Sequence, residues 1–461
     1  MSEATGLRQP KKASADLFRK LGVEPVPDNE KVQEAIRHLD DFRFRVRSFV
    51  MAMESCVKCG ACAEACHTYL GTRDPNNIPA GRVDLIRKAY KRYFTVQGQL
   101  FPGLVGAQDL DLETIEKWYS YFYQCSECRR CAHVCPFGID TAEVTFIARQ
   151  ILYWLGIAPQ LHAATAEAIL RTGNHMGLTK AGIEDTLEFL AEEIEEDYDG
   201  LKVEFPVDKP NSDILYVPSS ADFMLNPNTL KGAAMFFKYV GANWTISSEI
   251  TEAGNFGYLS DQSRIQREMV TRLFREATKL GVKKIVWGEC GHGWRAAKMY
   301  PPTVSDLPGV KRIPITHIHD EVEAYIKAGR LELDPKRNDR KVTLHDPCNY
   351  ARACGHSDNM RVIMNAVVPK GAFVEMKPSR EANFCCGGGS GILFDDPDMY
   401  QFRILASNKK AEQVRETGAD TLCAPCSICK AQLYPMVKEH KLPVEVVGLI
   451  DLVGHALVFR D

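Results

Sequence analysis

Apolar residues recur at helical spacing near the start of the chain, with few helix breakers between them. The apolar positions are Val32, Ile36, Leu39 and Phe42. Because a spacing of three or four residues places side chains on one face of an α-helix, we predict a helical extension over residues 1–50. A second helical pattern over residues 163–200 ends in the acidic run AEEIEEDYDG, which is typical of a solvent-facing surface. It predicts a helical connector over residues 161–209.

The pattern changes in the second half, where short β-rich runs alternate with helical segments. The runs are ILYVP at 214–218, KKIVW at 283–287 and KVTLH at 341–345. Such alternation is typical of α/β layers around parallel strands, and it predicts two α/β domains, at residues 210–335 and 338–461. Each contains a cysteine-bearing turn followed by Tyr-Pro, GECGHGWRAAKMYP in the first and APCSICKAQLYP in the second, so the two domains form a weak internal repeat.

Between these regions, two cysteine runs share one tight spacing. They are Cys56-x-x-Cys59-x-x-Cys62-x-x-x-Cys66 and Cys125-x-x-Cys128-x-x-Cys131-x-x-x-Cys135-Pro136. Three thiolates so close in sequence reach three irons of one [4Fe-4S] cubane, while the fourth cysteine reaches the other cluster. The predicted ligands are Cys56, Cys59, Cys62 and Cys135 for the first cubane, and Cys66, Cys125, Cys128 and Cys131 for the second. Zinc ribbons and disulfide frameworks also use Cys-x-x-Cys, but they explain runs of four cysteines less well.

Composition and charge narrow the function classes further. The chain has 461 residues, of which 45% are hydrophobic, and a net charge of -3, so nothing points to nucleic acid as the main partner. The N-terminal residues lack a signal-peptide pattern, and no apolar run is long enough for a direct membrane span. We therefore expect a cytoplasmic protein whose cysteines, sixteen in all, serve metal or redox chemistry.

A third group of cysteines lies in the last α/β domain. It consists of Cys348 in HDPCNYARACG, Cys385 and Cys386 in NFCCGGGSG, and Cys426 and Cys429 in APCSICK. The glycines behind the adjacent pair permit positive φ and close approach of the backbone to a bulky cofactor. Loops at the carboxyl ends of parallel strands are also where open α/β sheets bind ligands. Buried core cysteines in a glycine-rich turn are the simpler alternative.

These motifs resemble the CCG domain of heterodisulfide reductase catalytic subunits. The order of two ferredoxin-type runs followed by two CCG-type halves resembles the HdrD-like family over about residues 50–455. The long spacing between the runs is similar to that in the helical ferredoxin-like domains of respiratory iron-sulfur subunits, and it places such a domain at residues 51–160. The resemblance implies an α+β multidomain fold, with a helical ferredoxin-like domain that holds two [4Fe-4S] clusters and two α/β CCG-type domains. It further implies one noncubane [4Fe-4S] cluster that reductively cleaves a disulfide. The implied ligands and catalytic residues are Cys348, Cys385, Cys386, Cys426 and Cys429.

Two cysteines near this motif leave alternatives open. Cys354 and Cys423 lie outside the motif positions, but Cys423-Ala-Pro-Cys426 is itself a Cys-x-x-Cys, so the ligand register could shift by three residues. The family pattern, Pro-Cys-x-x-Cys, favours Cys426 and Cys429.

The first CCG half departs from the family pattern. Where cysteines are expected, the chain has Ser219-Ser220, Glu252-Ala253-Gly254 and Cys290-Gly291-His292-Gly293, so a second noncubane cluster is not expected. Cys290 is a candidate catalytic residue, with a remnant thiol or a wall of the site as alternatives.

Within the family, the degenerate first half is most similar to DsrK-type subunits of the Dsr membrane complex of dissimilatory sulfur metabolism. This similarity implies an oxidoreductase acting on sulfur groups, held at the inner membrane by partner subunits. Its partners would be a quinone-linked membrane cytochrome b subunit of the DsrM type and a DsrC-like sulfur carrier as disulfide or trisulfide substrate. The alternatives are an iron-sulfur electron-transfer subunit of a glycolate, lactate or glycerol-3-phosphate quinone oxidoreductase, and a purely structural or regulatory cluster protein.

Overall fold

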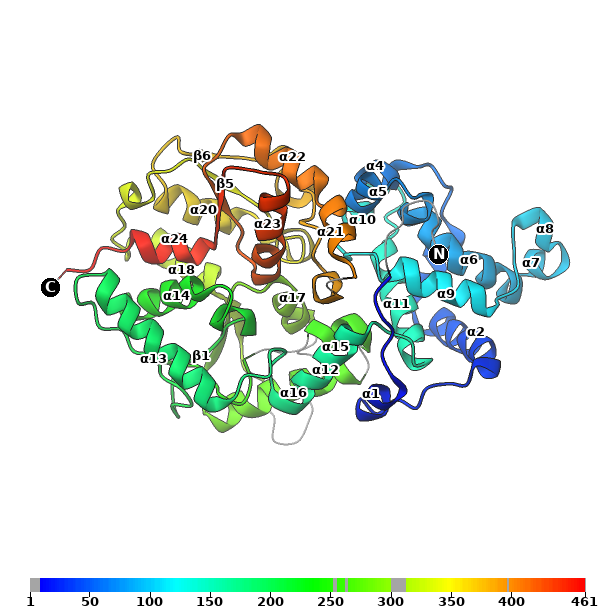
Figure 1. Cartoon of the computed structure of the whole chain (residues 1–461), viewed down its shortest axis with the longest axis horizontal. Helices are drawn as coiled ribbons and strands as arrows, with labels where there is room; N and C mark the ends of the chain where they lie inside the picture. Colours follow the sequence, from blue (N-terminus) through cyan, green and yellow to red (C-terminus); the bar gives the residue numbers. More distant parts are fainter. Residues whose placement is uncertain (1–8, 252–254, 262–263, 300–311, 396–397, 461) are drawn as a thin grey trace. The chain divides into compact units, whose positions relative to one another are not determined.

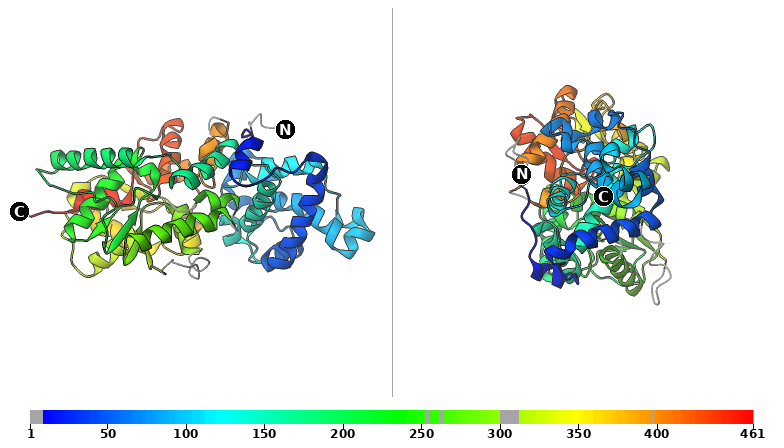
Figure 2. Two further views of the ribbon diagram at one scale, coloured as in Figure 1. Left: turned by 90° about the horizontal axis from the view of Figure 1, so that it is seen from below. Right: turned by 90° about the vertical axis from the view of Figure 1, so that its right-hand side faces the viewer.

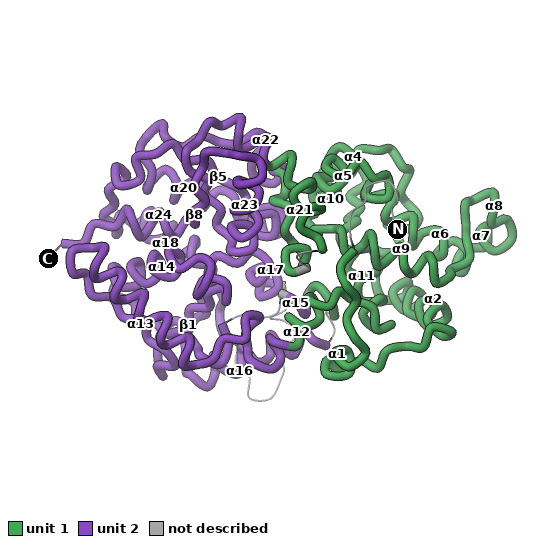
Figure 3. Tube along the Cα trace, viewed as in Figure 1, with its two compact units in different colours: residues 1–167, 259–262, 384–410 green, residues 168–258, 263–383, 411–461 purple. Residues whose placement is uncertain are grey.

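The computed structural model describes residues 9–251, 255–261, 264–299, 312–395 and 398–460. The chain forms two compact units, which Figure 3 shows in different colours. Unit 1 comprises residues 1–167, 259–262 and 384–410, and unit 2 comprises residues 168–258, 263–383 and 411–461. Residues 384–410, which the sequence places in the C-terminal domain, thus pack with the N-terminal helices. The domain bounds drawn from the sequence remain predictions.

Unit 1 is built from helices, as the apolar spacing predicts (Figure 1). Its helices are α1 (Ala15–Lys20), α2 (Asp28–Arg45), α3 (Arg47–Glu54), α4 (Ala61–Ala65), α5 (His67–Thr72), α6 (Pro79–Phe94), α7 (Val96–Leu100), α8 (Pro102–Val105), α9 (Leu112–Phe122), α10 (Arg130–Val134), α11 (Thr141–Trp154) and α21 (Tyr400–Ala406), with 3-10 turns at Pro75–Asn77 and Ile392–Asp395; α12 (Gln160–Thr172) leads into unit 2. Asp111 caps α9, since its Oδ1 accepts the Thr114 N–H at 2.7 Å.

Helix α11 forms the centre of unit 1. Asp140 caps its start, and nearly every residue from Ala142 to Tyr153 is buried. A helix that is apolar on all sides belongs in a core. Arg149 is the exception in this stretch, with a charged side chain that is fully buried.

The segment 384–410 packs on the N-terminal helices through α21 and α5. A Cβ atom at Gly71 would lie 2.1 Å from the Leu405 carbonyl oxygen, so only glycine permits this approach. His67, at the start of α5, bonds through Nδ1 to the carbonyl oxygen of Ala406 at 2.9 Å. The two helices therefore form one closely packed pair.

Unit 2 contains two four-stranded parallel sheets, with strand orders β2-β1-β3-β4 and β6-β5-β7-β8. The strands are β1 (Ile214–Val217), β2 (Trp244–Thr245), β3 (Lys284–Trp287), β4 (Ile315–His317), β5 (Val342–Leu344), β6 (Phe373–Val374), β7 (Thr421–Cys423) and β8 (Glu445–Val447). The three strand runs expected from the sequence are β1, β3 and β5. The matching strand orders confirm the internal repeat, although Tyr300 and Pro301 of the first Tyr-Pro turn lie outside the described residues.

The strand order fixes where ligand-binding loops gather in each half. In the first half, β2 is added on one side of β1 and β3 on the other, so the switch point of the strand order lies between β1 and β3. In the second half it lies between β5 and β7. Ligands of open parallel sheets bind at the carboxyl ends of the strands beside this switch point. Ser219 and Cys290 follow β1 and β3, whereas Cys348 and Cys426 follow β5 and β7.

Helices surround both sheets and join the two halves. They are α13 (Lys180–Asp197), α14 (Pro227–Tyr239), α15 (Asn255–Ser260), α16 (Ile265–Lys279), α17 (Gly291–Met299), α18 (Ile318–Lys327), α19 (Ala351–Cys354), α20 (Asp358–Val367), α22 (Asn408–Thr417), α23 (Ser427–Glu439) and α24 (Leu449–Ala456). Helix α14 packs on α24 where Gly232 meets Gly454, and one apolar core extends through both halves. No described helix is long and apolar enough to cross a bilayer.

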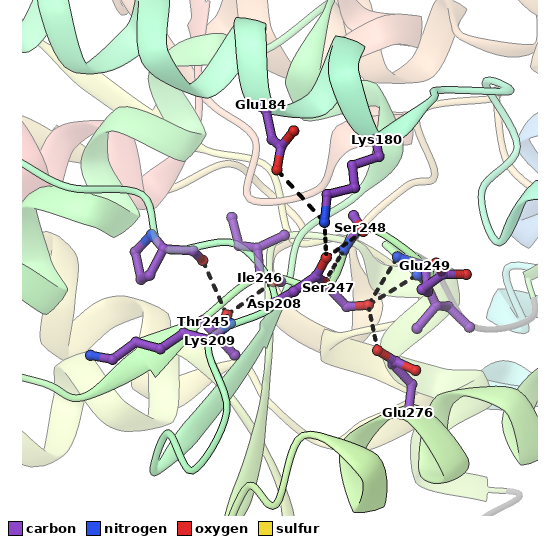
Figure 4. A network of polar contacts seen from close by, with 12 residues as sticks. Lys180, Glu184, Asp208, Lys209, Thr245, Ile246, Ser247, Ser248, Glu249 and Glu276 are labelled. Atoms are coloured by element: carbon purple, nitrogen blue, oxygen red, sulfur yellow. Dashed lines mark hydrogen bonds and ion pairs between the residues drawn. The ribbon is translucent and has the colours of Figure 1, made fainter.

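A polar network holds the loop after β2 in place (Figure 4). The Asp208 carboxylate accepts the Ser248 N–H at 2.8 Å, the Ser248 hydroxyl at 2.6 Å and the Lys180 ammonium at 2.9 Å. Burial alone would raise the pKa of Asp208, but the Ser248 hydrogen bonds and Lys180 outweigh it and lower the pKa. In the first half, this loop is therefore held by hydroxyl and carboxylate groups.

Candidate functional site

The four cysteines predicted for the first cubane line one small cavity. Cys56, Cys59, Cys62 and Cys135 share it with apolar side chains such as Phe137. Arg87 and Cys131, a cysteine predicted for the second cubane, also line this cavity. Lys58 and Gly60 have φ of 56° and 84°, which turns the backbone around the cavity. Four thiols with an apolar lining form a donor set that fits a [4Fe-4S] cluster.

The cysteines predicted for the second cubane lie deeper. Burial raises the pKa of the Cys131 thiol to about 12, and the neighbouring Cys125 and Cys66 add to the shift. Burial also raises the pKa of Cys66, where the Arg82 guanidinium acts in the opposite direction. Cys66 of the first run and Cys125 and Cys131 of the second thus lie near enough to influence one another, and the crossed ligand assignment stays a prediction. No disulfide joins any of the sixteen cysteines, all of which the structure describes.

Arg149 connects the second cysteine run to the CCGGG segment. Its guanidinium donates to the carbonyl oxygens of Phe122 at 2.9 Å and Cys125 at 2.8 Å. The same group donates to the Ser390 carbonyl oxygen at 2.9 Å and to the Ser390 hydroxyl at 2.7 Å. The buried Glu127 carboxylate lies 3.5 Å away. A single fully buried side chain thus fixes the Cys125 loop against the residue that follows the glycines.

Two further contacts connect the same parts of unit 1. The Arg130 guanidinium stacks on the Phe384 ring at 3.7 Å and donates to the Ala65 carbonyl oxygen at 2.9 Å. His67, besides its bond to α21, contacts the Ser126 hydroxyl through Nε2 at 2.7 Å. Ligand atoms of His67, Cys128 and Cys385 lie within 4.8 Å of one another. The adjacent-cysteine pair therefore begins beside a predicted ligand of the second cubane.

The CCGGG loop has the tight backbone that its sequence predicts. Cys385 and Cys386 are buried, and Gly387 and Gly391 have φ of 98° and 85°. A Cβ atom at Gly391 would lie 3.0 Å from His162 Nδ1, so glycine is needed there for close packing as well.

The other three motif cysteines belong to unit 2, at the carboxyl ends of β5 and β7. Cys426 precedes α23 and Cys429 lies in its first turn, while Cys348 follows β5. A hydrogen bond from Cys429 lowers the pKa of Cys426, and the Gly291 N–H also donates to Cys426 Sγ, at 3.4 Å. A helix N-terminus stabilises a thiolate in the same way.

Cys290 and Cys423 have different surroundings. Cys290 is buried, and the next residue, Gly291, packs against the Cys426 loop. A Cβ atom at Gly291 would lie 3.5 Å from Cys426 Sγ and 3.5 Å from the Asn349 side chain, so Cys290 lies beside this loop. Cys423 is the last residue of β7, and burial raises the pKa of its thiol well above the usual value. Cys354 ends α19 and is half-buried.

A buried ionic network lies behind the Cys426 loop. Glu289 Oε1 contacts His319 Nε2 at 2.9 Å, and Glu289 Oε2 lies 3.5 Å from the Lys430 ammonium. Burial alone would raise the pKa of Glu289, but Lys430 and His319 outweigh it and lower the pKa. Burial raises the pKa of Asp222, which accepts the Ser427 hydroxyl, to about 7. The first half thus supports the second with charges directly behind its cysteines.

Serines occupy the first half where the second carries a motif cysteine. The Ser219 hydroxyl caps a 3-10 turn by accepting the Ala221 N–H at 3.4 Å, and Ser220 Oγ lies 3.4 Å from Thr251 Oγ1. Residues Glu252, Ala253 and Gly254 lie outside the described residues. The two serines thus have structural roles, and the expectation of a single noncubane cluster stays a prediction.

Comparison with known proteins decides the family. A 4Fe-4S dicluster domain matches residues 52–139, and the cysteine-rich CCG domain matches residues 342–434. An Hdr-like menaquinol oxidoreductase iron-sulfur subunit of Archaeoglobus profundus is 35% identical, covering 91% of this chain and 82% of that protein. The chain belongs to the Hdr-like iron-sulfur oxidoreductase family.

Other relatives of this Hdr-like chain agree. Iron-sulfur subunit 2 of the Hdr-like menaquinol oxidoreductase of Archaeoglobus fulgidus is 34% identical, covering 96% of this chain and 86% of that protein. One subunit of the dihydromethanophenazine:CoB–CoM heterodisulfide reductase of Methanosarcina barkeri is 25% identical over 88% of this chain and 95% of its own length. The fold class, the family and the iron-sulfur type of the chain are confirmed, and the dicluster match favours clusters over zinc or disulfides.

Several residues around the site were missed by sequence reasoning. Arg149, Arg130, Glu289 and Lys430 were not singled out, because their partners are far away along the chain. A signal existed for Arg149, which stands among apolar residues in TFIARQILYW.

Proposed function

We propose that this chain is the iron-sulfur catalytic subunit of a membrane-associated respiratory complex. It passes electrons between a quinol-linked membrane partner and a disulfide or trisulfide at the CCG motif. Two relatives carry the name menaquinol oxidoreductase, and a third is a heterodisulfide reductase subunit, so the family contains both ends of this route.

The observation that carries the proposal is the contact between the second cysteine run and the Cys385 loop in unit 1. Arg149 donates to Cys125 and Ser390. Arg130 of the run stacks on Phe384, and ligand atoms of His67, Cys128 and Cys385 lie within 4.8 Å of one another. Rigid, dry contacts of this kind suit electron transfer, since they fix the separation of two redox centres and exclude water. The order of transfer would be first cubane, second cubane and CCG site.

We assign the ligands of a single noncubane cluster from the motif. They are Cys348, Cys385, Cys386, Cys426 and Cys429. The CCG family match includes all five, and within unit 2 the thiolate-stabilising environment of Cys426 supports Cys426 and Cys429 over Cys423. The two cubanes take the eight cysteines of the runs.

Reduction of a disulfide consumes two electrons and two protons, breaks the S–S bond and forms two S–H bonds. A cluster at the CCG motif would supply an iron that binds sulfur and delivers the electrons. The chain's own residues do the rest: the α23 N-terminus stabilises thiolate charge at Cys426, and the Glu289–Lys430 network holds α23 against the first half.

The partners follow from the same route. A membrane cytochrome b subunit of the DsrM type would exchange electrons with the first cubane, and a DsrC-like sulfur carrier would be the substrate. The degenerate first half leaves one reaction site for that carrier.

The test compares Cys385→Ser with Cys354→Ser in the chain carrying its full complement of clusters. Cys354 is a matched control, because it lies in the same half but outside the motif. With a reduced viologen as electron donor, Cys385→Ser should lose disulfide cleavage while keeping the signals of both cubanes, and Cys354→Ser should retain activity. If Cys385→Ser still cleaves the disulfide, the proposed site is wrong. Equal lack of cleavage by wild type and both variants would favour the relay subunit of another quinone oxidoreductase.

A further inference from the structure

A small apolar hairpin projects from the end of α6 in unit 1 (Figures 1 and 2). It consists of α7 and α8. Residues 93–108, YFTVQGQLFPGLVGAQ, contain no Asp, Glu, Lys, Arg or His, although a quarter of the chain is charged. The hairpin therefore differs in composition from an ordinary solvated surface.

Four large apolar side chains of the hairpin face solvent. The exposed fractions are 68% for Val96, 66% for Leu100, 60% for Phe101 and 87% for Leu104. Single exposed apolar residues are common, but four within nine positions of a charge-free segment form a patch that marks an interaction site.

The exposure does not result from a loosely held segment. Thr95 Oγ1 accepts the Gly98 N–H at 3.1 Å and so caps α7. A Cβ atom at Gly98 would lie 1.9 Å from the Lys91 carbonyl oxygen, so α7 is pressed against the end of α6. The Lys91 ammonium donates to the Val105 carbonyl oxygen at 3.1 Å. The hairpin is thus fixed at both helices with its apolar side chains outward.

Basic and aromatic residues at the end of α6 lead into the hairpin, and the exposed acidic residues Asp109 and Asp111 follow it. Lys88, Lys91 and Arg92 lie in the last two turns of α6, next to Tyr93, and among these cations Arg92 pairs with Asp109 at 2.8 Å. Apolar side chains bordered by aromatic rings and long cations are the arrangement that suits the interface of a bilayer with anionic headgroups.

We propose that the α7–α8 hairpin inserts its apolar side chains into the interfacial layer of a lipid bilayer. A bilayer accepts apolar surface without matched donors and acceptors, whereas a protein interface needs about one hydrogen bond per 100–200 Å². Residues 95–106 of the hairpin carry only uncharged side chains, and the polar ones among them are Thr95, Gln97 and Gln99. A lipid surface therefore fits it better than a protein groove. This inference does not depend on the proposed function.

The insertion would orient the electron route. Helix α6 runs from the hairpin to the first cubane cavity, which Ala80 helps to line. At 1.5 Å per residue its sixteen residues span about 24 Å. The first cubane would thus lie roughly that far along α6 from the membrane surface.

Flotation with vesicles tests the proposal. The full chain with its clusters is mixed with vesicles of equal parts phosphatidylcholine and phosphatidylglycerol, without any other protein. The variant combines Leu100→Ser, Phe101→Ser and Leu104→Ser, and the control is Phe189→Ser on α13, where the side chain is 58% exposed. Unchanged cluster absorbance and circular dichroism show that each variant is folded.

Wild type and Phe189→Ser should float with the vesicles, and the triple variant should bind about a thousandfold more weakly, since each of the three large side chains contributes about tenfold. Equal binding of the triple variant would overturn the proposal. The proposal would also be wrong if the wild type did not bind lipid vesicles but did bind vesicles that carry an integral membrane protein. The hairpin would then be a protein-docking site.

Discussion

Replacement of Arg149 by Met tests the connection between the second cysteine run and the Cys385 loop. Methionine fills a similar volume but removes every donor. In the wild type these donors serve Phe122, Cys125 and Ser390, and the positive charge faces the buried Glu127. The variant would leave three buried carbonyl oxygens and a carboxylate without their donor.

The expected cost can be worked from these contacts. Breaking a buried ion pair by removing one partner costs about 3–5 kcal/mol, and each abandoned buried acceptor about 1–3 kcal/mol. Because neighbouring groups relax, we expect a net loss of about 3–5 kcal/mol, a large part of the 5–15 kcal/mol that usually stabilises a native domain. Arg149→Lys keeps the charge, but one ammonium cannot reach acceptors on both sides, so it should recover only part of the loss.

Stability alone would not show that Arg149 serves electron transfer, so the assay has two parts. Denaturant unfolding gives the free energy of unfolding, and stopped-flow absorbance gives the rate at which a disulfide reoxidises the reduced cubanes. Arg272→Met is the matched control, because Arg272 is half-buried and also donates to the carbonyl oxygens of two residues, Ile169 at 3.1 Å and Leu170.

Both variants should lose stability, but Arg149→Met alone should slow reoxidation, by roughly tenfold or more. If Arg149→Met is destabilised and still reoxidises at the wild-type rate, the contact has no part in the electron route and the reasoning fails. If Arg272→Met slows reoxidation equally, the effect comes from a general loss of stability.

Three further changes probe other parts of the account. Burial raises the pKa of Asp222 from 3.8 to about 7. The free energy of unfolding of the wild type should therefore fall as the pH rises through this range, by about 4 kcal/mol in total. Unfolding measured from about pH 4 to pH 8 should show a flatter profile for Asp222→Asn. Gly71→Ala should separate α5 from α21 and lower the melting temperature. Gly103→Ala is the control and should leave the melting temperature unchanged, because a Cβ atom there meets nothing within 4 Å. Equal melting temperatures of the two variants would contradict the close packing of α5 on α21. Cys290→Ser should keep turnover within a few-fold of wild type, because the hydroxyl can still accept the Gly293 N–H, and a hundredfold loss with intact clusters would instead make Cys290 a catalytic thiol.

Local sequence patterns were sufficient for the N-terminal helices, for strands β1, β3 and β5 and for the cysteine runs. Helix α2 follows the apolar spacing of Val32, Ile36, Leu39 and Phe42, and β1 and β3 are short apolar runs bounded by turns. Strands β2 and β6 have two residues each and carry too little pattern to be recognised.

Contacts between distant parts of the chain could not be predicted in this way. Arg149 and Ser390 are 241 residues apart, and Lys430 and Glu289 are 141 residues apart. Neither spacing nor composition indicates that residues 384–410 join the N-terminal helices. A buried arginine within an apolar helix shows only that some distant acceptor must exist, because an unpaired buried charge would be too costly.

The most direct measurement is electron paramagnetic resonance of the anaerobically purified chain, oxidised and then mixed with a thiol or a small disulfide. We expect two cubane signals on reduction and a further signal in the oxidised protein that changes when the thiol binds. Two ordinary cubane signals, with no signal that responds to thiol, would contradict a catalytic cluster at the CCG motif and leave the chain as an electron relay.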